Sequence, residues 1–205
     1  MLTLIRREIQ DHVAYLVLGG LLAALMVTGL VVQALVRDGA TVVICLPLLI
    51  LALFGFCVMG AAQMYSDCAG RISSFLSTLA VTRGQILIAR FFVGVLTILL
   101  TIVPPAIAGV IVLQELVPPF AFYSHFVARV YATVLLVALS SYCFGLRIGW
   151  NTGKFIRLFG MILLPAILLS LVSIKGFSVD AIVLLAILTA ALTVSVTMKF
   201  CSTPL

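Results

Sequence analysis

Apolar residues fill six long stretches of this chain, and polar residues gather in the shorter segments between them. A helix needs about 20 mostly apolar residues to cross a bilayer. The six stretches meet this length or come close to it, and they are Tyr15–Val36, Thr41–Met64, Ile86–Leu113, Val127–Leu146, Phe155–Ile174 and Ala181–Met198. They lack the alternating pattern of barrel strands. The pattern predicts an all-α polytopic membrane protein, with six transmembrane helices in a single domain covering residues 1–205.

The longest polar interruption follows the second stretch and runs from Ser66 to Arg90. Within it, apolar residues at Ile72, Phe75, Leu76 and Leu79 have the spacing of one helix face. Asp67 and Gly70 precede this stripe and favour a turn or a helix start. Thr82 to Gln85 fits a capping box that opens the third transmembrane helix. Residues 66–84 are therefore predicted to hold a short cytoplasmic helix, a turn and a new helix start.

The N-terminal segment, residues 1–14, has apolar residues at helical spacing and arginines elsewhere on the helix wheel. This amphipathic pattern is typical of a helix that lies along the membrane surface. The alternative is that it extends the first transmembrane helix into water. The first apolar stretch is too long for the core of a cleavable signal peptide, so we expect it to remain in the protein.

Composition and charge support the membrane interpretation and suggest an orientation. Hydrophobic residues make up 64% of the 205 residues and charged residues only 9%, against about 25% in soluble proteins. With a cytoplasmic N-terminus, the inner side holds Arg6, Arg7, Arg71, Arg83, Arg90, Arg147, Lys154, Arg157 and Lys199, and the outer side holds Arg37, Arg129 and Lys175. Basic residues favour the cytoplasmic side. Both termini are therefore expected in the cytoplasm, and the net charge of +6 reflects topology, not nucleic-acid binding.

Candidate chemistry within the chain is sparse. We find essentially no ionisable residue deep in an apolar stretch, where such residues usually mark function. The five cysteines are scattered without a CxxC or Cys/His cluster, so no metal site or disulfide framework is predicted. Residues 149–154 superficially resemble a phosphate-binding loop, but three residues separate the glycines and Phe155 follows the lysine. We expect no catalytic residue, no cofactor and no metal in this chain, which is not an enzyme by itself.

Small residues and prolines within the stretches suggest close packing and bending. Gly145 and Gly149 form a small-x3-small pair that permits close helix contact and is weak evidence for a dimer face. Pro104, Pro105 and Pro165 are expected to kink their helices and are candidate gating positions.

The segment after the second stretch resembles the coupling region of the ABC-2 type permeases, the membrane subunits of ABC exporters. The resemblance is carried by Asp67, Gly70, Arg71, Ile72, Phe75, Leu76, Leu79, Val81, Thr82, Arg83, Ile86 and Arg90, and by the six-helix layout with its N-terminal helix. The match departs from the family at Ala80, where proline is frequent, at Asp67, where Glu is commoner, and at Arg90, where Lys is frequent.

The resemblance implies that residues 1–14 are an elbow helix and that residues 66–84 carry a coupling helix seated in a cleft of a separate cytoplasmic P-loop ATPase. It assigns apolar contact to Phe75, Leu76 and Leu79, the polar rim to Arg71 and Arg83, and the helix start to Asp67 with Gly70. The partner ATPase binds ATP and Mg²⁺, and a second permease copy or a paralogue completes the translocation pathway. The location implied is the prokaryotic inner membrane, in contact with lipid.

Other functions remain open at this point. The family includes haem-exporter-like permeases of cytochrome c maturation, although no histidine lies within an apolar stretch here. A non-transporting anchor or assembly subunit would use the same segment to hold a soluble protein. A stand-alone channel would need polar residues along a helix, and the stretches offer scattered Ser and Thr with Gln33.

Overall fold

The computed structural model describes residues 9–10, 12–36, 40–70, 83–116, 124–150 and 154–202, and the regular structure in these ranges is helical. The helices bounded within these ranges are α2 (Val13–Val36), α3 (Ala40–Gly70), α5 (Arg83–Leu116), α6 (Ser124–Gly149), α7 (Lys154–Lys175) and α8 (Val179–Ser202). Each contains one of the six apolar stretches, which confirms the all-α fold class.

Five of these helices are long and apolar enough to cross a membrane, namely α2, α3, α5, α6 and α8. Helix α7 has a shorter apolar part, Phe159–Lys175. Many large apolar side chains on the outer faces are exposed, for example Leu21 on α2 and Ile187 on α8. A bundle with such an exterior is stable only where apolar solvent surrounds it, so the helices indicate an integral membrane protein.

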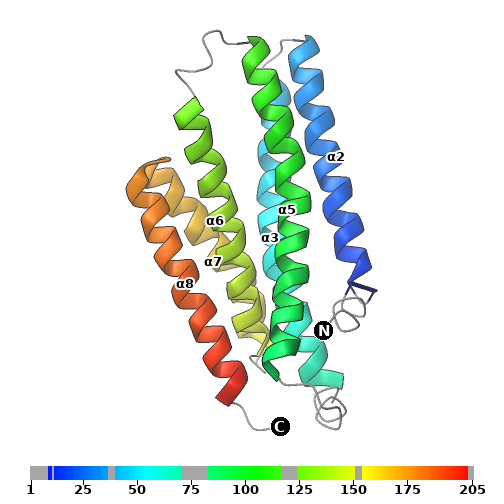
Figure 1. Cartoon of the computed structure of the whole chain (residues 1–205), viewed down its shortest axis with the longest axis vertical. Helices are drawn as coiled ribbons and strands as arrows, with labels where there is room; N and C mark the ends of the chain where they lie inside the picture. The colour runs from blue at the N-terminus through cyan, green and yellow to red at the C-terminus, as the bar shows by residue number, and fades with distance from the viewer. Residues whose placement is uncertain are drawn as a thin grey trace.

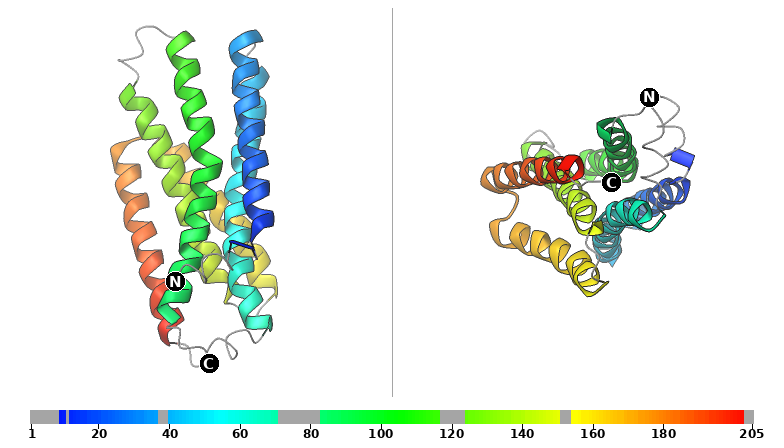
Figure 2. Two further views of the ribbon diagram at one scale, coloured as in Figure 1. Left: turned by 45° about the vertical axis from the view of Figure 1, so that its right-hand side comes forward. Right: turned by 90° about the horizontal axis from the view of Figure 1, so that it is seen from below.

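The helices form one elongated bundle whose centre is the α3–α6 pair, the most extensive helix contact. Helices α2 and α5 pack together on one side, while α8 packs against α6 on the other. Seen along the bundle axis, α2 and the α7–α8 hairpin lie at opposite sides (Figure 2). Helix α2 begins, α3 ends, α5 begins and α8 ends near one end of the bundle (Figure 1).

Glycines set the separation of α3 and α6. These helices run in the same direction (Figure 1), and a Cβ atom on Gly149 would lie 2.6 Å from the carbonyl oxygen of Ala61. A Cβ atom on Gly145 would overlap the carbonyl of Cys57, one helical turn earlier in both helices. The predicted small-x3-small pair thus makes a contact within the protomer, so it is not evidence for a dimer face.

A short turn, residues 176–178, connects α7 to α8. Gly176 adopts a positive φ of 65°, a conformation that glycine adopts without steric cost. The backbone amide of Ala181 donates to the Ser178 hydroxyl at 3.3 Å, which caps the start of α8.

Candidate functional site

The predicted coupling region, residues 66–84, includes the last turn of α3, the start of α5 and the segment that connects them. Helix α3 continues through Asp67 to Gly70, so these two residues form its final turn. The polar residues after Met64 do not interrupt the helix, and Gly70 provides the common helix-ending residue. Helix α5 begins at Arg83, directly after Thr82, as the capping box predicts. The backbone alone is described for Asp67, Gly70 and Arg83, while Arg71, Phe75, Leu76 and Leu79 lie outside the described residues.

Both helices that border this segment exceed the thickness of a bilayer. Helix α3 has 31 residues and α5 has 34, which correspond to roughly 46 and 51 Å at about 1.5 Å per residue. The hydrocarbon core of a bilayer is only about 30 Å thick. In α3 the apolar part ends at Tyr65. The last turn of α3 therefore extends beyond its membrane-spanning part at the end where residues 71–82 connect it to α5.

A buried polar cluster joins α3, α5 and α6 near this end of the bundle. Its centre is Tyr142 on α6, which is fully buried. The Tyr142 hydroxyl lies 2.8 Å from Oε1 of Gln63 on α3 and 3.1 Å from the backbone carbonyl oxygen of Arg90 on α5. One side chain thus contacts both helices that border the predicted coupling region.

The other members of the cluster are also enclosed. Arg90 is only 4% exposed, and its Nη1 donates to the sulfur of Met64 at 4.0 Å. Gln63 is 1% exposed, and its Nε2 has no hydrogen-bond partner. Burying a cation and an unsatisfied amide donor costs free energy, more so in a medium without water. Such residues in a membrane protein usually mark function.

Gly94 makes room for the tyrosine ring, and Gly60 makes room for the Tyr142 backbone. A Cβ atom on Gly94 of α5 would overlap the Tyr142 ring, and one on Gly60 of α3 would lie 2.5 Å from the Tyr142 carbonyl oxygen. Phe91 packs beside the ring, with the two ring centroids 6.0 Å apart. The ring therefore packs against α5, and the α6 backbone at Tyr142 packs against α3.

Sequence reasoning missed this cluster. It found no ionisable residue deep in an apolar stretch, whereas Arg90 is buried between helices and its carbonyl oxygen accepts from the Tyr142 hydroxyl. A signal was present, because Arg90 lies inside the third stretch and Gln63 near the end of the second. Gln63 and Arg90 are joined through Tyr142. Predicting this cluster therefore requires knowing that α3, α5 and α6 are adjacent, which hydropathy does not specify.

The candidate gating prolines lie within continuous helices. Pro104 and Pro105 are in α5 and Pro165 is in α7. The Pro165 ring is fully buried. Pro105 borders a cavity of about 190 Å³ shared by α2, α3, α5 and α6, together with Thr101 and Tyr131. A proline removes the hydrogen bond to the carbonyl four residues earlier, which for Pro105 is that of Thr101.

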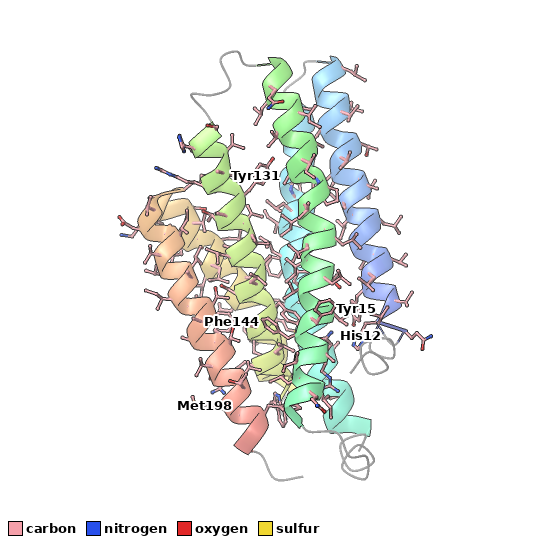
Figure 3. All side chains as sticks on the ribbon, viewed as in Figure 1. His12, Tyr15, Tyr131, Phe144 and Met198 are labelled. Atoms are coloured by element: carbon pink, nitrogen blue, oxygen red, sulfur yellow. The ribbon has the colours of Figure 1, made fainter. Side chains whose placement is uncertain are left out.

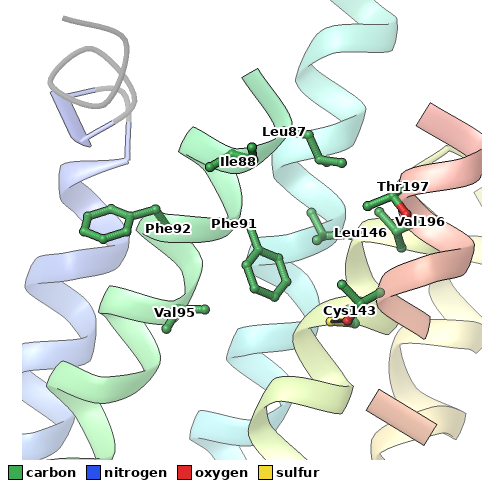
Figure 4. A pocket seen from close by; sticks show the side chains of 10 residues that line it. Leu87, Ile88, Phe91, Phe92, Val95, Cys143, Leu146, Val196 and Thr197 are labelled. Atoms are coloured by element: carbon green, nitrogen blue, oxygen red, sulfur yellow. Dashed lines mark hydrogen bonds between the residues drawn. The ribbon is translucent and has the colours of Figure 1, made fainter. Parts of the chain in front are cut away.

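Two larger clefts open on the outside of the bundle. One, of about 550 Å³, lies between α2 and α3 and has Thr97 and Thr101 of α5 among its lining residues. The other, of about 400 Å³, lies between α5 and α8 with residues of α6 at its base (Figure 4). Its lining is formed by Leu87, Ile88, Phe91, Phe92, Val95, Cys143, Leu146, Thr193, Val196 and Thr197. Both clefts suit apolar molecules such as lipid chains.

Within the described ranges, no group of three or more His, Cys, Asp or Glu residues lies close enough together to hold a metal ion. His12 lies at the lower end of α2, beside Tyr15 (Figure 3), and His125 lies in the first turn of α6 at the other end of the bundle. These two histidines cannot act together on one ligand.

Comparison with protein-family models, with curated proteins and with solved structures gave no match to this chain.

Proposed function

We propose that this chain is the membrane-spanning permease subunit of an ATP-driven ABC exporter. In this proposal α7 is the sixth transmembrane helix, both termini are cytoplasmic, and residues 66–84 contact a separate cytoplasmic ATPase. Two permease copies, or this chain and a paralogue, form the translocation pathway in a prokaryotic inner membrane. ATP and Mg²⁺ are bound by the ATPase, which leaves this chain without a catalytic role.

One observation carries the proposal. The segment that resembles a coupling helix connects the extended end of α3 to the start of α5, at the end of the bundle where α2 begins and α8 ends (Figure 1). A soluble partner at that end reaches two long helices through one connection. The adjacent Gln63–Tyr142–Arg90 contacts link those helices to a third, α6.

The proposal is tested by isolating the tagged chain from its native membrane in mild detergent. Mass spectrometry should identify a P-loop ATPase, and the complex should hydrolyse ATP and contain two permeases and two ATPases. An ATPase bound in another stoichiometry and without hydrolysis would favour an anchoring subunit. Complexes that lack any ATPase would overturn the proposal.

A further inference from the structure

We propose that Gln63, Tyr142 and Arg90 form a hydrogen-bond switch that couples the ends of α3 and α5 to α6. This inference rests on the proposed function for its biological role, since the segment between these ends is the one assigned to the ATPase. Its physical basis is independent of that role.

The switch follows from the hydrogen-bonding capacity of a tyrosine. A phenol has one proton to donate, yet two acceptors lie within reach of the Tyr142 hydroxyl, Gln63 Oε1 at 2.8 Å and the Arg90 carbonyl oxygen at 3.1 Å. The hydroxyl can make only one of these bonds at full strength. Two hydrogen-bonded arrangements of the same three residues therefore exist, one tied to α3 and the other to α5.

The cluster is also incompletely satisfied. The Nε2 atom of Gln63 is buried without a hydrogen-bond partner. A buried unpaired donor raises the free energy of the arrangement that contains it. Releasing Gln63 to another orientation offers relief, so the arrangement with the Tyr142 bond to Gln63 is not strongly favoured over the alternative.

The positions of the acceptors connect the switch to the coupling region. Gln63 lies two helical turns before the end of α3 at Gly70, and Arg90 lies two turns after the start of α5 at Arg83. The Tyr142 ring is confined by Gly94 and Phe91 of α5. A relative shift of the two helix ends changes the two hydrogen-bond distances while the phenol stays in place.

The consequence is a discrete response to a relative shift of the end of α3 and the start of α5. When α3 moves away from α6, the hydroxyl donates to the Arg90 carbonyl, and when α3 returns, it donates to Gln63. A small displacement at the cytoplasmic end is thereby converted into a choice between two bonds, which is the kind of bistable element that coupling between sites requires.

The test is hydrogen–deuterium exchange on the purified full chain, with three variants. Tyr142→Phe removes the donor to both acceptors, so amides in the last turns of α3 and the first turns of α5 should exchange about two- to tenfold faster. Gln63→Leu leaves the hydroxyl free to bond the Arg90 carbonyl, so only α3 should exchange faster. Tyr131→Phe removes a hydroxyl from the upper half of the same helix (Figure 3) and should leave both regions unchanged.

Wild-type exchange in Tyr142→Phe, or equal loss of protection at both ends in Gln63→Leu, would overturn the switch. If Tyr142→Phe does not fold, the asymmetry expected for Gln63→Leu decides alone. Capture of an ATPase by the wild-type chain is measured separately, so that failure of the switch and failure of the proposed function can be distinguished. A wild-type chain that captures no ATPase refutes the proposed function, whereas the exchange pattern still decides whether the switch exists.

Discussion

At the scale of single residues, glycines determine how the central helices meet. Gly145 and Gly149 on α6 face Cys57 and Ala61 on α3, where no space remains for a side chain. Gly55, two residues before Cys57 on α3, has nothing within 4 Å of the position that a Cβ atom would take. The two kinds of glycine therefore respond oppositely to the same added methyl group.

We expect Gly145→Ala to destabilise the folded chain by about 1–3 kcal/mol, because the methyl group must displace the α3 backbone. Gly55→Ala should be neutral or stabilising by up to about 1 kcal/mol, because alanine favours the helix and meets no neighbour. Thermal unfolding of both variants in the same detergent provides the comparison. Equal stability of the two would show that the α3–α6 separation is not set by Gly145.

At the scale of elements, the parallel pair α6 and α8 is joined by polar contacts inside an apolar bundle. The hydroxyls of Ser140 and Thr189 lie 3.0 Å apart, and the sulfur of Cys143 lies 3.7 Å from the Thr193 hydroxyl. Hydrogen bonds between transmembrane helices stabilise by about 0.6 kcal/mol on average. These contacts fix the register of α8 on α6 more than they add stability.

A double-mutant cycle of Ser140→Ala and Thr189→Val should give a coupling free energy of about 0.6 kcal/mol. The matched control is Ser170→Ala on α7, since the Ser170 hydroxyl is exposed and donates to the carbonyl of Ala166 within its own helix. Chemical unfolding in detergent measures the stabilities of the four proteins of the cycle and of the control. Additive effects of Ser140→Ala and Thr189→Val would contradict a direct bond.

Pro104 and Pro105 in α5 and Pro165 in α7 are candidate hinges of their helices. The substitution Pro165→Ala tests one of them. Alanine removes the buried ring and restores the hydrogen bond to the carbonyl four residues earlier, which stiffens α7. Because a hinge substitution changes turnover, ATP hydrolysis by the complex should change about twofold or more. Pro47→Ala on α3, where the proline is exposed, is the control. Unchanged hydrolysis in Pro165→Ala would remove it from the gating positions.

Sequence patterns predicted the elements better than their partners. Long apolar stretches locate helices because each must satisfy its backbone within itself in lipid, and the start of α5 at Arg83 follows from a local capping pattern. The end of α3 at Gly70 was harder to predict from the sequence, because polar residues such as Asp67 are compatible with both a helix and a turn. The Tyr142 cluster depends on three helices meeting, and no local pattern specifies that.

At the scale of the whole molecule, the bundle has two different ends. The start of α2, the end of α8 and the connection between α3 and α5 share one end, whereas the longest connection at the other end is that between α5 and α6 (Figure 1). In the proposed topology all six helices cross the membrane, and an even number of crossings returns the chain to the side on which α2 begins. With the charge asymmetry of the sequence, the first end is the cytoplasmic one in the proposed topology.

This topology predicts which positions a membrane-impermeant maleimide reaches in intact cells. Asp180→Cys, in the first turn of α8, should be labelled because the proposed topology places this turn on the outer side. Lys199→Cys, in the last turn of the same helix, should be labelled only after the membrane is opened. Labelling of the unsubstituted chain measures how much maleimide reacts with the native cysteines. Labelling of Lys199→Cys in intact cells would reverse the orientation.

The central claim is that residues 66–84 couple this chain to an ATPase, and capture of that ATPase by surface variants tests it most directly. A charge in the apolar contact of a helix seated in a cleft is strongly destabilising, so Phe75→Asp should lose the ATPase. Ser77→Asp, on the opposite side of the same predicted helix, should retain it at the wild-type yield. An ATPase that stays bound to Phe75→Asp, or that is lost equally from both variants, would contradict the assignment of this coupling surface.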